Sequence, residues 1–326
     1  MSVTWSSSFP DLLCGEDSGV FSGESPECSS SDLDSSVFAQ ESIAGFIEDE
    51  RNFVPGFDYL TRFQTQSLDA SAREESVAWI LKAQAYYNFQ PLTAYLSINY
   101  MDRFLYSRRL PQNKGWPWQL LSVACLSLAA KMEEPLVPSL LDLQVEGAKF
   151  IFETKTIRRM ELLVLSVLDW RLRSVTPFSF IDFFACKLDS TGTFMGFLVS
   201  RATEIILSNI QDASFLEYRP SSIAAAAILC AASEIPNLSL FNPEQAESWC
   251  DGLSKEKIMS CYRLMQELVL NDSRRKPTKF IPQLRVTIRA RMRSSSDSST
   301  SSSSSPSYKR RKINNCLWVE DDKGCS

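Results

Sequence analysis

The side chains that could do chemistry in this 326-residue chain are carboxylates and thiols, because the sequence holds 39 acidic residues and nine cysteines but no histidine. Without histidine there is no Ser-His or Cys-His nucleophile, no H-E-x-x-H zinc site and no H-R-D kinase loop. Only 11 glycines are present, and none forms a phosphate-binding loop or a nucleophile elbow. A carboxylate-only hydrolase stays open as an alternative, although few reaction classes need nothing else. We therefore expect no enzyme, no cofactor and no metal site.

The cysteines are odd in number, widely spread and never in C-x-x-C spacing. A disulfide scaffold or a zinc knuckle would cluster them. We expect mostly buried, reduced thiols in a cytosolic or nuclear protein, with Cys14 as the exception.

The spacing around Cys14 is that of a docking peptide. In an extended strand, Leu12, Cys14 and Glu16 face one side, because successive side chains alternate. Two apolar side chains and one carboxylate then reach the same groove of a partner, while backbone hydrogen bonds add affinity. The alternative is a chance match.

Charge divides the chain into unlike segments. Residues 1–50 hold 11 acidic and no basic residues, residues 51–270 hold 21 basic and 23 acidic ones, and residues 271–312 hold 12 basic and 2 acidic ones. We predict a disordered acidic leader over 1–40 and a disordered, serine-rich basic tail over 286–326, because neither can bury enough apolar surface to fold. The longest apolar run, 223–232, is too short to cross a bilayer, so we expect a soluble intracellular protein without a membrane partner.

Between the tails the apolar period is helical, and prolines mark the breaks. The first half predicts five helices, over 71–89, 91–104, 117–132, 138–146 and 153–169. The small-residue run 222–232 resembles the run 121–130, and amphipathic segments flank it at 193–210 and 255–270. Pro177 disfavours helix at Thr176 and divides the halves. We predict an all-α fold of two tandem five-helix repeats, over 41–174 and 175–285; a single larger bundle is the rival.

Four strings in this order resemble a cyclin box: Arg73-x5-Trp79-Ile80, Asn99-Tyr100-Met101-Asp102-Arg103-Phe104-Leu105, Leu126-Ser127-Leu128-Ala129-Ala130-Lys131-Met132-Glu133-Glu134 and Arg159-Met160-Glu161-Leu162-Leu163. The resemblance extends to a second, more divergent cyclin repeat that starts at Thr176-Pro177-Phe178. The Leu12-x-Cys14-x-Glu16 leader is similar to that of D-type cyclins, and Gly115-Trp116 and Asp169-Trp170-Arg171-Leu172 resemble the plant branch.

The resemblance implies an activating regulatory subunit of a cyclin-dependent protein kinase. In the family, a lysine and a glutamate hydrogen-bond the backbone around the kinase C helix, and they correspond to Lys131 and Glu161. Met132 and its apolar neighbours would supply contact area. Such a kinase is competent only when its C-helix glutamate pairs with the β3 lysine, so a partner that moves this helix inward activates phosphoryl transfer. The alternative is that Lys131 and Glu161 are solvated charges.

Two further sets of positions follow from the same resemblance. Arg73 and Asp102 are expected to form a buried pair that is structural. The family's apolar docking patch for Arg-x-Leu peptides keeps Trp79 and Gln119. Glu75 and Ser76 replace apolar residues there, so we expect an altered patch at which peptide docking is either lost or shifted toward basic partners.

The remaining expectations concern partners and location. The leader motif is similar to peptides that dock the retinoblastoma pocket, which implies a retinoblastoma-related partner and a role in the passage from the first gap phase to DNA synthesis. Kinase-inhibitor proteins are further expected partners. The basic run Lys309-Arg310-Arg311-Lys312 predicts nuclear import, with the cytoplasm as a second location.

The alternative function is a cyclin-fold transcription adaptor on a protein–DNA complex. A transcription adaptor of this kind needs strongly basic repeats, whereas residues 51–270 carry a net charge of −2. We therefore expect no direct nucleic-acid binding.

Overall fold

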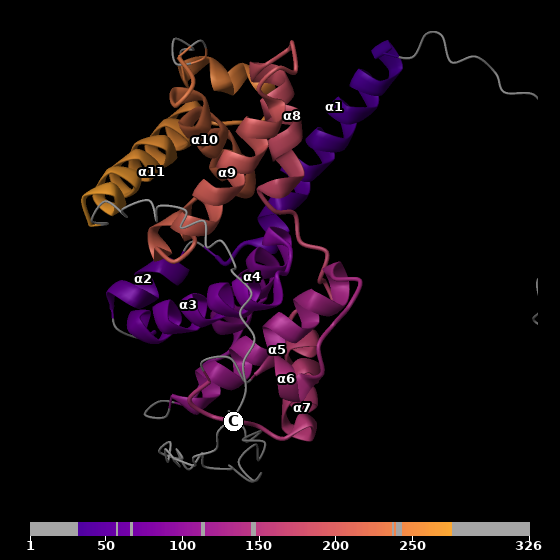
Figure 1. Cartoon of the computed structure of the whole chain (residues 1–326), viewed down its shortest axis with the longest axis vertical. Helices are drawn as coiled ribbons and strands as arrows, with labels where there is room; N and C mark the ends of the chain where they lie inside the picture. Colours follow the sequence, from indigo (N-terminus) through magenta and orange to yellow (C-terminus); the bar gives the residue numbers. More distant parts are fainter. Residues whose placement is uncertain are drawn as a thin grey trace, which may run out of the picture. The chain divides into compact units, whose positions relative to one another are not determined.

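A computed structural model describes residues 32–56, 58–65, 68–111, 115–144, 148–236, 238 and 243–275. Within these ranges every regular element is a helix, and no strand occurs (Figure 1). None of the described helices is long and apolar enough to cross a bilayer. The Leu12–Glu16 motif and the Lys309–Lys312 run lie outside the described residues. The helical content confirms the all-α prediction.

The first repeat contains the five helices α3 (Ala70–Tyr87), α4 (Pro91–Ser107), α5 (Trp116–Glu133), α6 (Leu140–Leu143) and α7 (Thr154–Val167), preceded by the short α2 (Tyr59–Gln64). Their bounds follow local signals. Asp69 accepts a hydrogen bond from the Ala72 amide and so caps α3, and Asn88 ends α3 in the left-handed conformation that asparagine tolerates. Proline stands in the first turn of α4 and of α5. Only α6 is clearly shorter than its predicted range.

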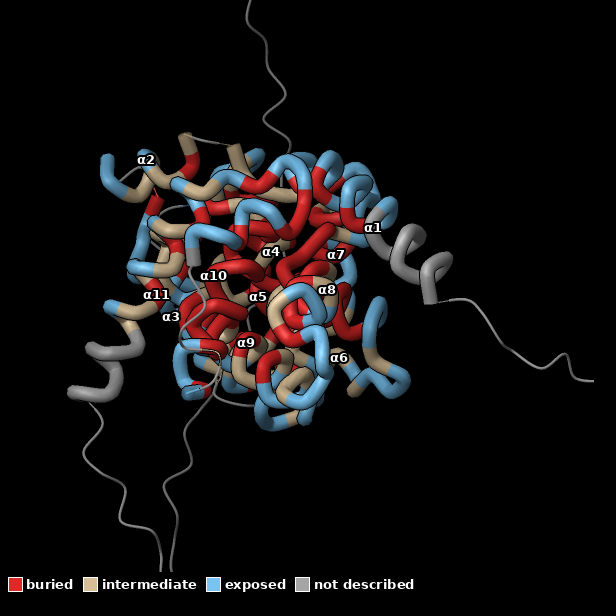
Figure 2. Tube along the Cα trace, turned by 90° about the horizontal axis from the view of Figure 1, so that it is seen from above, coloured by how far each residue is buried: buried red, intermediate tan, exposed pale blue. Residues whose placement is uncertain are grey.

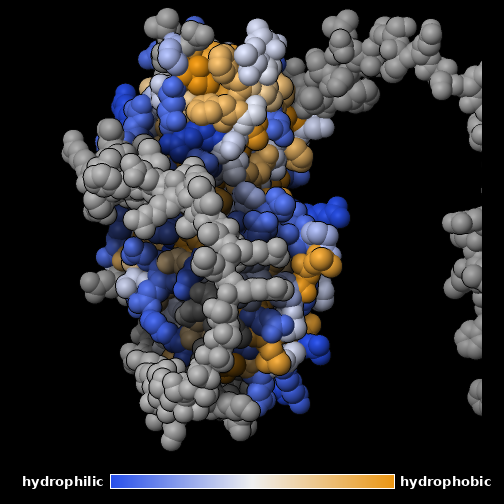
Figure 3. All heavy atoms as spheres, viewed as in Figure 1, coloured by the Kyte–Doolittle hydropathy of each residue, from blue (hydrophilic) through white to orange (hydrophobic). Residues whose placement is uncertain are grey.

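The second repeat contains α8 (Phe178–Leu188), α9 (Met195–Asn209), α10 (Pro220–Ser233) and α11 (Lys255–Arg275). Two 3-10 helices, η2 (Ala213–Glu217) and η3 (Pro243–Trp249), complete it, so its described residues form four α-helices where about five helices were expected. Each repeat has its own apolar core. Two tandem helical repeats are therefore confirmed. In Figure 3, hydrophobic residues gather on the upper part of the visible face, over the second repeat.

Each repeat is built around one helix of small and apolar residues. In α5 every residue from Leu120 to Ala130 is buried, and in α10 every residue from Pro220 to Ala232 is buried. The traces of both helices are correspondingly red in Figure 2. Alanine, serine and cysteine allow neighbouring helices to approach closely, which explains how all sides of these helices are covered.

The N-terminal helix α1 (Asp32–Asp49) was not expected from the sequence, which assigned residues up to 40 to a disordered leader and residues from 41 to the first repeat. In the structure Ile43 and Ile47 belong to the core of the second repeat, and Phe46 packs edge-on against Phe180 of α8. Among the described side chains of α1, Ile43 and Ile47 are the buried ones, and the sequence does not reveal which repeat covers them.

The chain is fixed to the second repeat at Glu50, which begins the 3-10 helix η1 (Glu50–Phe53). The carboxylate is fully buried and accepts hydrogen bonds from the amide and hydroxyl of Ser221, at 2.8 and 2.9 Å. Glu50 thereby caps the N-terminus of α10, where the helix dipole favours negative charge. Burial nevertheless raises the pKa of Glu50, against the opposing effects of Ser221 and of nearby Arg219 and Arg51.

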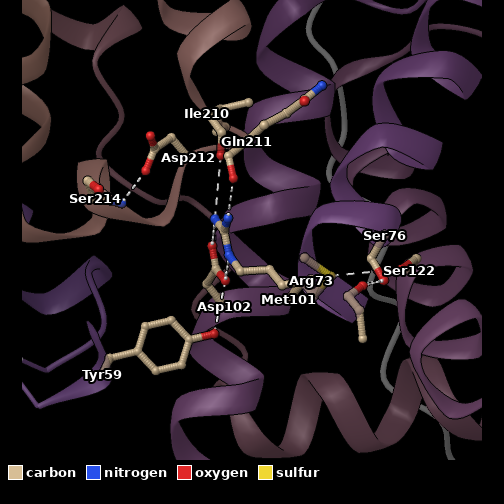
Figure 4. A network of polar contacts seen from close by, with 11 residues as sticks. Tyr59, Arg73, Ser76, Met101, Asp102, Ser122, Ile210, Gln211, Asp212 and Ser214 are labelled. Atoms are coloured by element: carbon tan, nitrogen blue, oxygen red, sulfur yellow. Dashed lines mark hydrogen bonds and ion pairs between the residues drawn. The ribbon is translucent and has the colours of Figure 1, made fainter. Parts of the chain in front are cut away.

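A buried ion pair of the first repeat also contacts the second repeat (Figure 4). Arg73 of α3 donates from Nε and Nη2 to the two carboxylate oxygens of Asp102 in α4, at 2.8 and 2.9 Å. Tyr59 of α2 donates its hydroxyl to the same carboxylate, at 2.9 Å. Arg73 also donates to the carbonyl of Gln211 in the second repeat, at 2.9 Å. Burial opposes the charge of Arg73, but Asp102 overcomes this and raises its pKa.

Replacing Asp102 by alanine should destabilise the chain by about 3–5 kcal/mol, because a buried guanidinium then loses its counter-charge. The double variant Arg73→Ala/Asp102→Ala should cost less than the sum of the two single changes, since it leaves no uncompensated charge. Urea denaturation measures both. Arg201→Ala, which breaks half-exposed ion pairs to Glu204 and Glu234, is the control and should cost less than about 1 kcal/mol. An Asp102→Ala cost as small as that of the control would contradict a stabilising pair.

Glu50 should make stability fall as the pH rises. Its pKa is raised above 4.5 in the folded chain, so the folded state holds this proton more tightly than the unfolded state does. The contribution of Glu50 to the free energy of unfolding is therefore largest below pH 4.5, and it is lost as the pH rises through the raised pKa. Urea unfolding of the wild type and of Glu50→Gln from pH 4 to 8 tests this. The stability difference should move in favour of Glu50→Gln with rising pH, and a constant difference would refute the assignment.

Candidate functional site

Lys131 and Glu161 meet where two helices of the first repeat pack together. Lys131 lies in the last turn of α5, directly after its buried run, and its side chain is 45% exposed. Glu161 lies in the apolar stripe of α7, between Ile157 and Leu165, and is buried. A carboxylate in such a stripe needs a partner. Nζ of Lys131 provides it, 2.7 Å from Oε1 of Glu161.

Beside this pair lies a groove of about 630 Å³, which we call the Lys131 groove. Its lining comes from the ends of α5 and α7, from η1 and from the segment between the repeats: Phe53, Leu128, Lys131, Met132, Leu165, Trp170, Arg171, Leu172 and Arg173. The lining is apolar apart from three cations. The ammonium group of Lys131 has three N–H donors, and the hydrogen bond to Glu161 uses one of them.

Exposed apolar side chains follow both members of the pair in sequence. Met132 is 38% exposed and Leu136 is 85% exposed after Lys131, and Leu162 is 59% exposed after Glu161. Trp170 is 68% exposed at the groove itself. Large apolar side chains left in solvent near a groove indicate a surface that binds another macromolecule. The arrangement suits an apolar side chain in the groove and hydrogen bonds at Lys131.

Polar side chains of α4 hold both segments that border the groove. Arg103 donates to the carbonyl of Arg171, at 2.9 Å, and its guanidinium lies 5.4 Å from the ring centre of Phe53. Tyr100 donates its hydroxyl to the carbonyl of Leu172, at 2.6 Å. Asn99 donates to the carbonyl of Phe53, at 2.7 Å. Sequence reasoning quoted these residues only as part of a motif and assigned them no role.

A second hollow, of about 360 Å³, contains the positions predicted as an altered docking patch. Glu75, Trp79 and Gln119 all line it, together with Trp118, Lys149 and Phe150. Gln119 donates to the carbonyl of Phe150 and accepts from the amides of Lys149 and Phe150. The exposed Glu75 forms an ion pair with Lys149 at 2.8 Å. The carboxylate expected to favour basic partners thus already has a cation of its own beside it.

In the described part of the chain, no three His, Cys, Asp or Glu side chains gather as a metal site would require. Among the described cysteines, Cys125, Cys230, Cys250 and Cys261 are buried, and Cys186 is exposed. Burial raises the pKa of the Cys230 thiol to about 12, which keeps it protonated and unreactive at neutral pH.

Comparison with known sequences gives a consistent result over the whole chain. The family profile described as "Cyclin, N-terminal domain" matches residues 41–173, and that described as "Cyclin, C-terminal domain" matches residues 175–303. The sequence is 67% identical to Cyclin-D1-1 of Arabidopsis thaliana over 100% of this chain and 96% of that protein. It is 52% identical to Cyclin-D2-1 of Oryza sativa subsp. japonica over 81% of this chain and 85% of that protein.

A solved structure shares the fold at low sequence identity. A chain of the yeast RNA Pol II CTD kinase CTDK-1 complex superposes with a TM-score of 0.52 at 15% identity, over 71% of this chain and 79% of that chain. This likeness concerns the arrangement of helices.

Proposed function

Because the chain belongs to the cyclin family, in its plant D-type branch, and is a regulatory subunit of cyclin-dependent kinases rather than an enzyme, we propose that the Lys131 groove is its kinase-binding surface. The observation that carries the proposal is the Lys131–Glu161 pair at the edge of an apolar groove, surrounded by exposed apolar side chains.

The groove can hold the C helix of a kinase in its active position. An apolar side chain of that helix enters between Leu128 and Leu165, while the free donors of Lys131 bind backbone carbonyls at the helix end. Exposed side chains such as Met132 add contact area around these bonds. Since the kinase is competent only with its C-helix glutamate paired to the β3 lysine, holding the helix inward activates phosphoryl transfer.

The leader and the tail extend this proposal. Leu12, Cys14 and Glu16 bind a retinoblastoma-related repressor as an extended peptide and bring the active kinase to it. Phosphorylation of the repressor then promotes the passage from the first gap phase to DNA synthesis. The run Lys309–Lys312 directs the chain to the nucleus.

The variant Lys131→Ala/Glu161→Ala should bind a purified cyclin-dependent kinase at least about 30-fold more weakly, since truncating hydrogen-bonded charges at an interface costs about 2 kcal/mol or more. Titration calorimetry measures the affinity, and kinase activity on a short peptide should fall with it. The matched control is Lys257→Ala/Glu217→Ala, which removes an exposed pair 2.6 Å apart in the second repeat. Equal affinity of the two double variants would exclude the Lys131 groove as the kinase surface.

The variant Cys14→Gly should leave kinase activation unchanged but weaken binding to the retinoblastoma-related protein at least about tenfold, as expected for one buried anchor of a docking peptide. Cys28→Gly, a change in the same leader outside the motif, is the control. Pull-down affinity and phosphorylation of the full repressor are the readouts. If Cys14→Gly and Cys28→Gly behave alike in both, the motif is a chance match, whereas the kinase proposal is unaffected.

A further inference from the structure

Four consecutive residues between the repeats, Trp170 to Arg173, form a basic and aromatic rim on the Lys131 groove. All four line the groove. Trp170, Arg171 and Arg173 are exposed, and only Leu172 is partly buried. Neither arginine forms an ion pair with a described residue. We call these residues the Trp170–Arg173 rim.

The backbone of the rim is rigidly held although its side chains are exposed. The carbonyl of Arg171 accepts from Arg103, and the carbonyl of Leu172 accepts from Tyr100, both from buried positions in α4. Arg103 also donates to the hydroxyl of Ser174, at 3.1 Å. A segment fixed in this way loses little further conformational freedom when it binds, which favours affinity.

The conformation of the rim is unusual for its residue types. Asp169 and Trp170 have φ angles of 51° and 60°, in the left-handed region that side chains with a Cβ rarely adopt. These two residues end α7 and turn the chain, so that the Trp170 amide donates to the Leu165 carbonyl at 2.9 Å. The positive φ of Asp169 belongs to the C-cap of α7, where the amides of Asp169 and Trp170 satisfy the carbonyls of Ser166 and Leu165. The positive φ of Trp170 is unusual for an aromatic residue, and such outliers gather at binding sites.

The charge of the rim specifies its ligand. Lys131 is already paired with Glu161, so Arg171 and Arg173 carry the uncompensated positive charge of the groove lining. The nearest carboxylate in sequence, that of Asp169, forms no ion pair with either arginine. Arginine binds carboxylates and phosphates through two parallel hydrogen bonds, and exposed tryptophan beside it is a frequent anchor of interfaces.

We infer that the Trp170–Arg173 rim is a second contact for the kinase, in which Arg171 and Arg173 bind an anionic group on the kinase while Trp170 packs against the surface beside it. This inference rests on the proposed kinase surface and adds a charge requirement to it. A carboxylate side chain and a phosphorylated residue offer the same chemistry. The partner therefore has an acidic or phosphorylated segment next to its C helix.

The test of the charge requirement compares Arg171→Gln/Arg173→Gln with Arg108→Gln/Arg109→Gln, two exposed arginines after α4 that also form no ion pair with a described residue. Affinity of the full chain for the purified kinase is measured at 50 and 500 mM salt, with the kinase phosphorylated and after phosphatase treatment. At 50 mM salt the rim variant should bind about tenfold more weakly than the control. Raising the salt should reduce the affinity of the rim variant less than that of the control, because salt screens the charge interaction that the rim variant lacks.

The two kinase forms identify the anion. If the rim variant binds both kinase forms more weakly than the control does, the anion is a carboxylate. If it binds only the phosphorylated form more weakly, the anion is a phosphate. Either result supports the inference. If the rim variant binds both forms as tightly as the Arg108→Gln/Arg109→Gln control does, the charge requirement is overturned.

Trp170→Gly tests the aromatic contact separately from folding. Glycine accepts the positive φ angle, so the melting temperature should stay the same or rise, while kinase affinity should fall about tenfold. Unchanged affinity would overturn the role of Trp170.

The Lys131→Ala/Glu161→Ala variant, measured in parallel, separates the two proposals. If it binds weakly while the rim variants bind normally, only the rim inference fails. If it also binds normally, the kinase surface itself is wrong.

Discussion

The carboxylate of Asp102 is the contact on which the arrangement of the first repeat and its connection to the second depend. It accepts from Arg73 and Tyr59, so one buried group fixes α2, α3 and α4 relative to one another. Arg73 in turn donates to the Gln211 carbonyl of the second repeat. A buried ion pair is weak as a source of net stability, but it strongly disfavours packings that separate its members. Its role here is to select one geometry of the helices.

The next residue along α4 extends this geometry to the surface. Arg103 donates to the carbonyl of Arg171 and lies over the ring of Phe53, two residues that line the Lys131 groove. Asp102 and Arg103 therefore connect the interior of the repeat to the segments that border the Lys131 groove. Helix α5 completes the site from the other side, because its buried run ends at Ala130 and the next residue, Lys131, emerges into solvent. Helices α4 and α5, both fixed by burial, thus position the segments that line the groove.

Much of this could be predicted from the sequence because the relevant signals are local. Proline at the first turns of α4, α5 and α10 and the apolar period located the helices to within a few residues. Arg73 and Asp102 were expected to pair, and they do. Lys131 and Glu161 were expected on one surface, and they are in contact there. Their binding of a kinase stays a prediction.

What could not be predicted depends on partners without a sequence signature. Arg103 and Tyr100 donate to backbone carbonyls, and every residue has a carbonyl, so no pattern marks the acceptors. The left-handed turn at Trp170 occurs without glycine, the usual indication of such a turn. The ion pair of Glu75 with Lys149 joins residues 74 positions apart. Ile43 and Ile47 lie next to the first repeat in sequence, yet they join the core of the second, and no local pattern marks this.

That last feature has a consequence for the order in which the chain acquires its structure during synthesis. Residues 43–50 leave the ribosome before their partners do. The core that covers Ile43 and Ile47, and Ser221, which binds Glu50, are synthesised more than a hundred residues later. The first repeat, whose core lies between Tyr59 and Leu168, can close in the meantime. Until α8 and α10 appear, the apolar side of α1 remains without its partner and is available to chaperones or to other nascent chains. Contacts of such long sequence separation also slow folding.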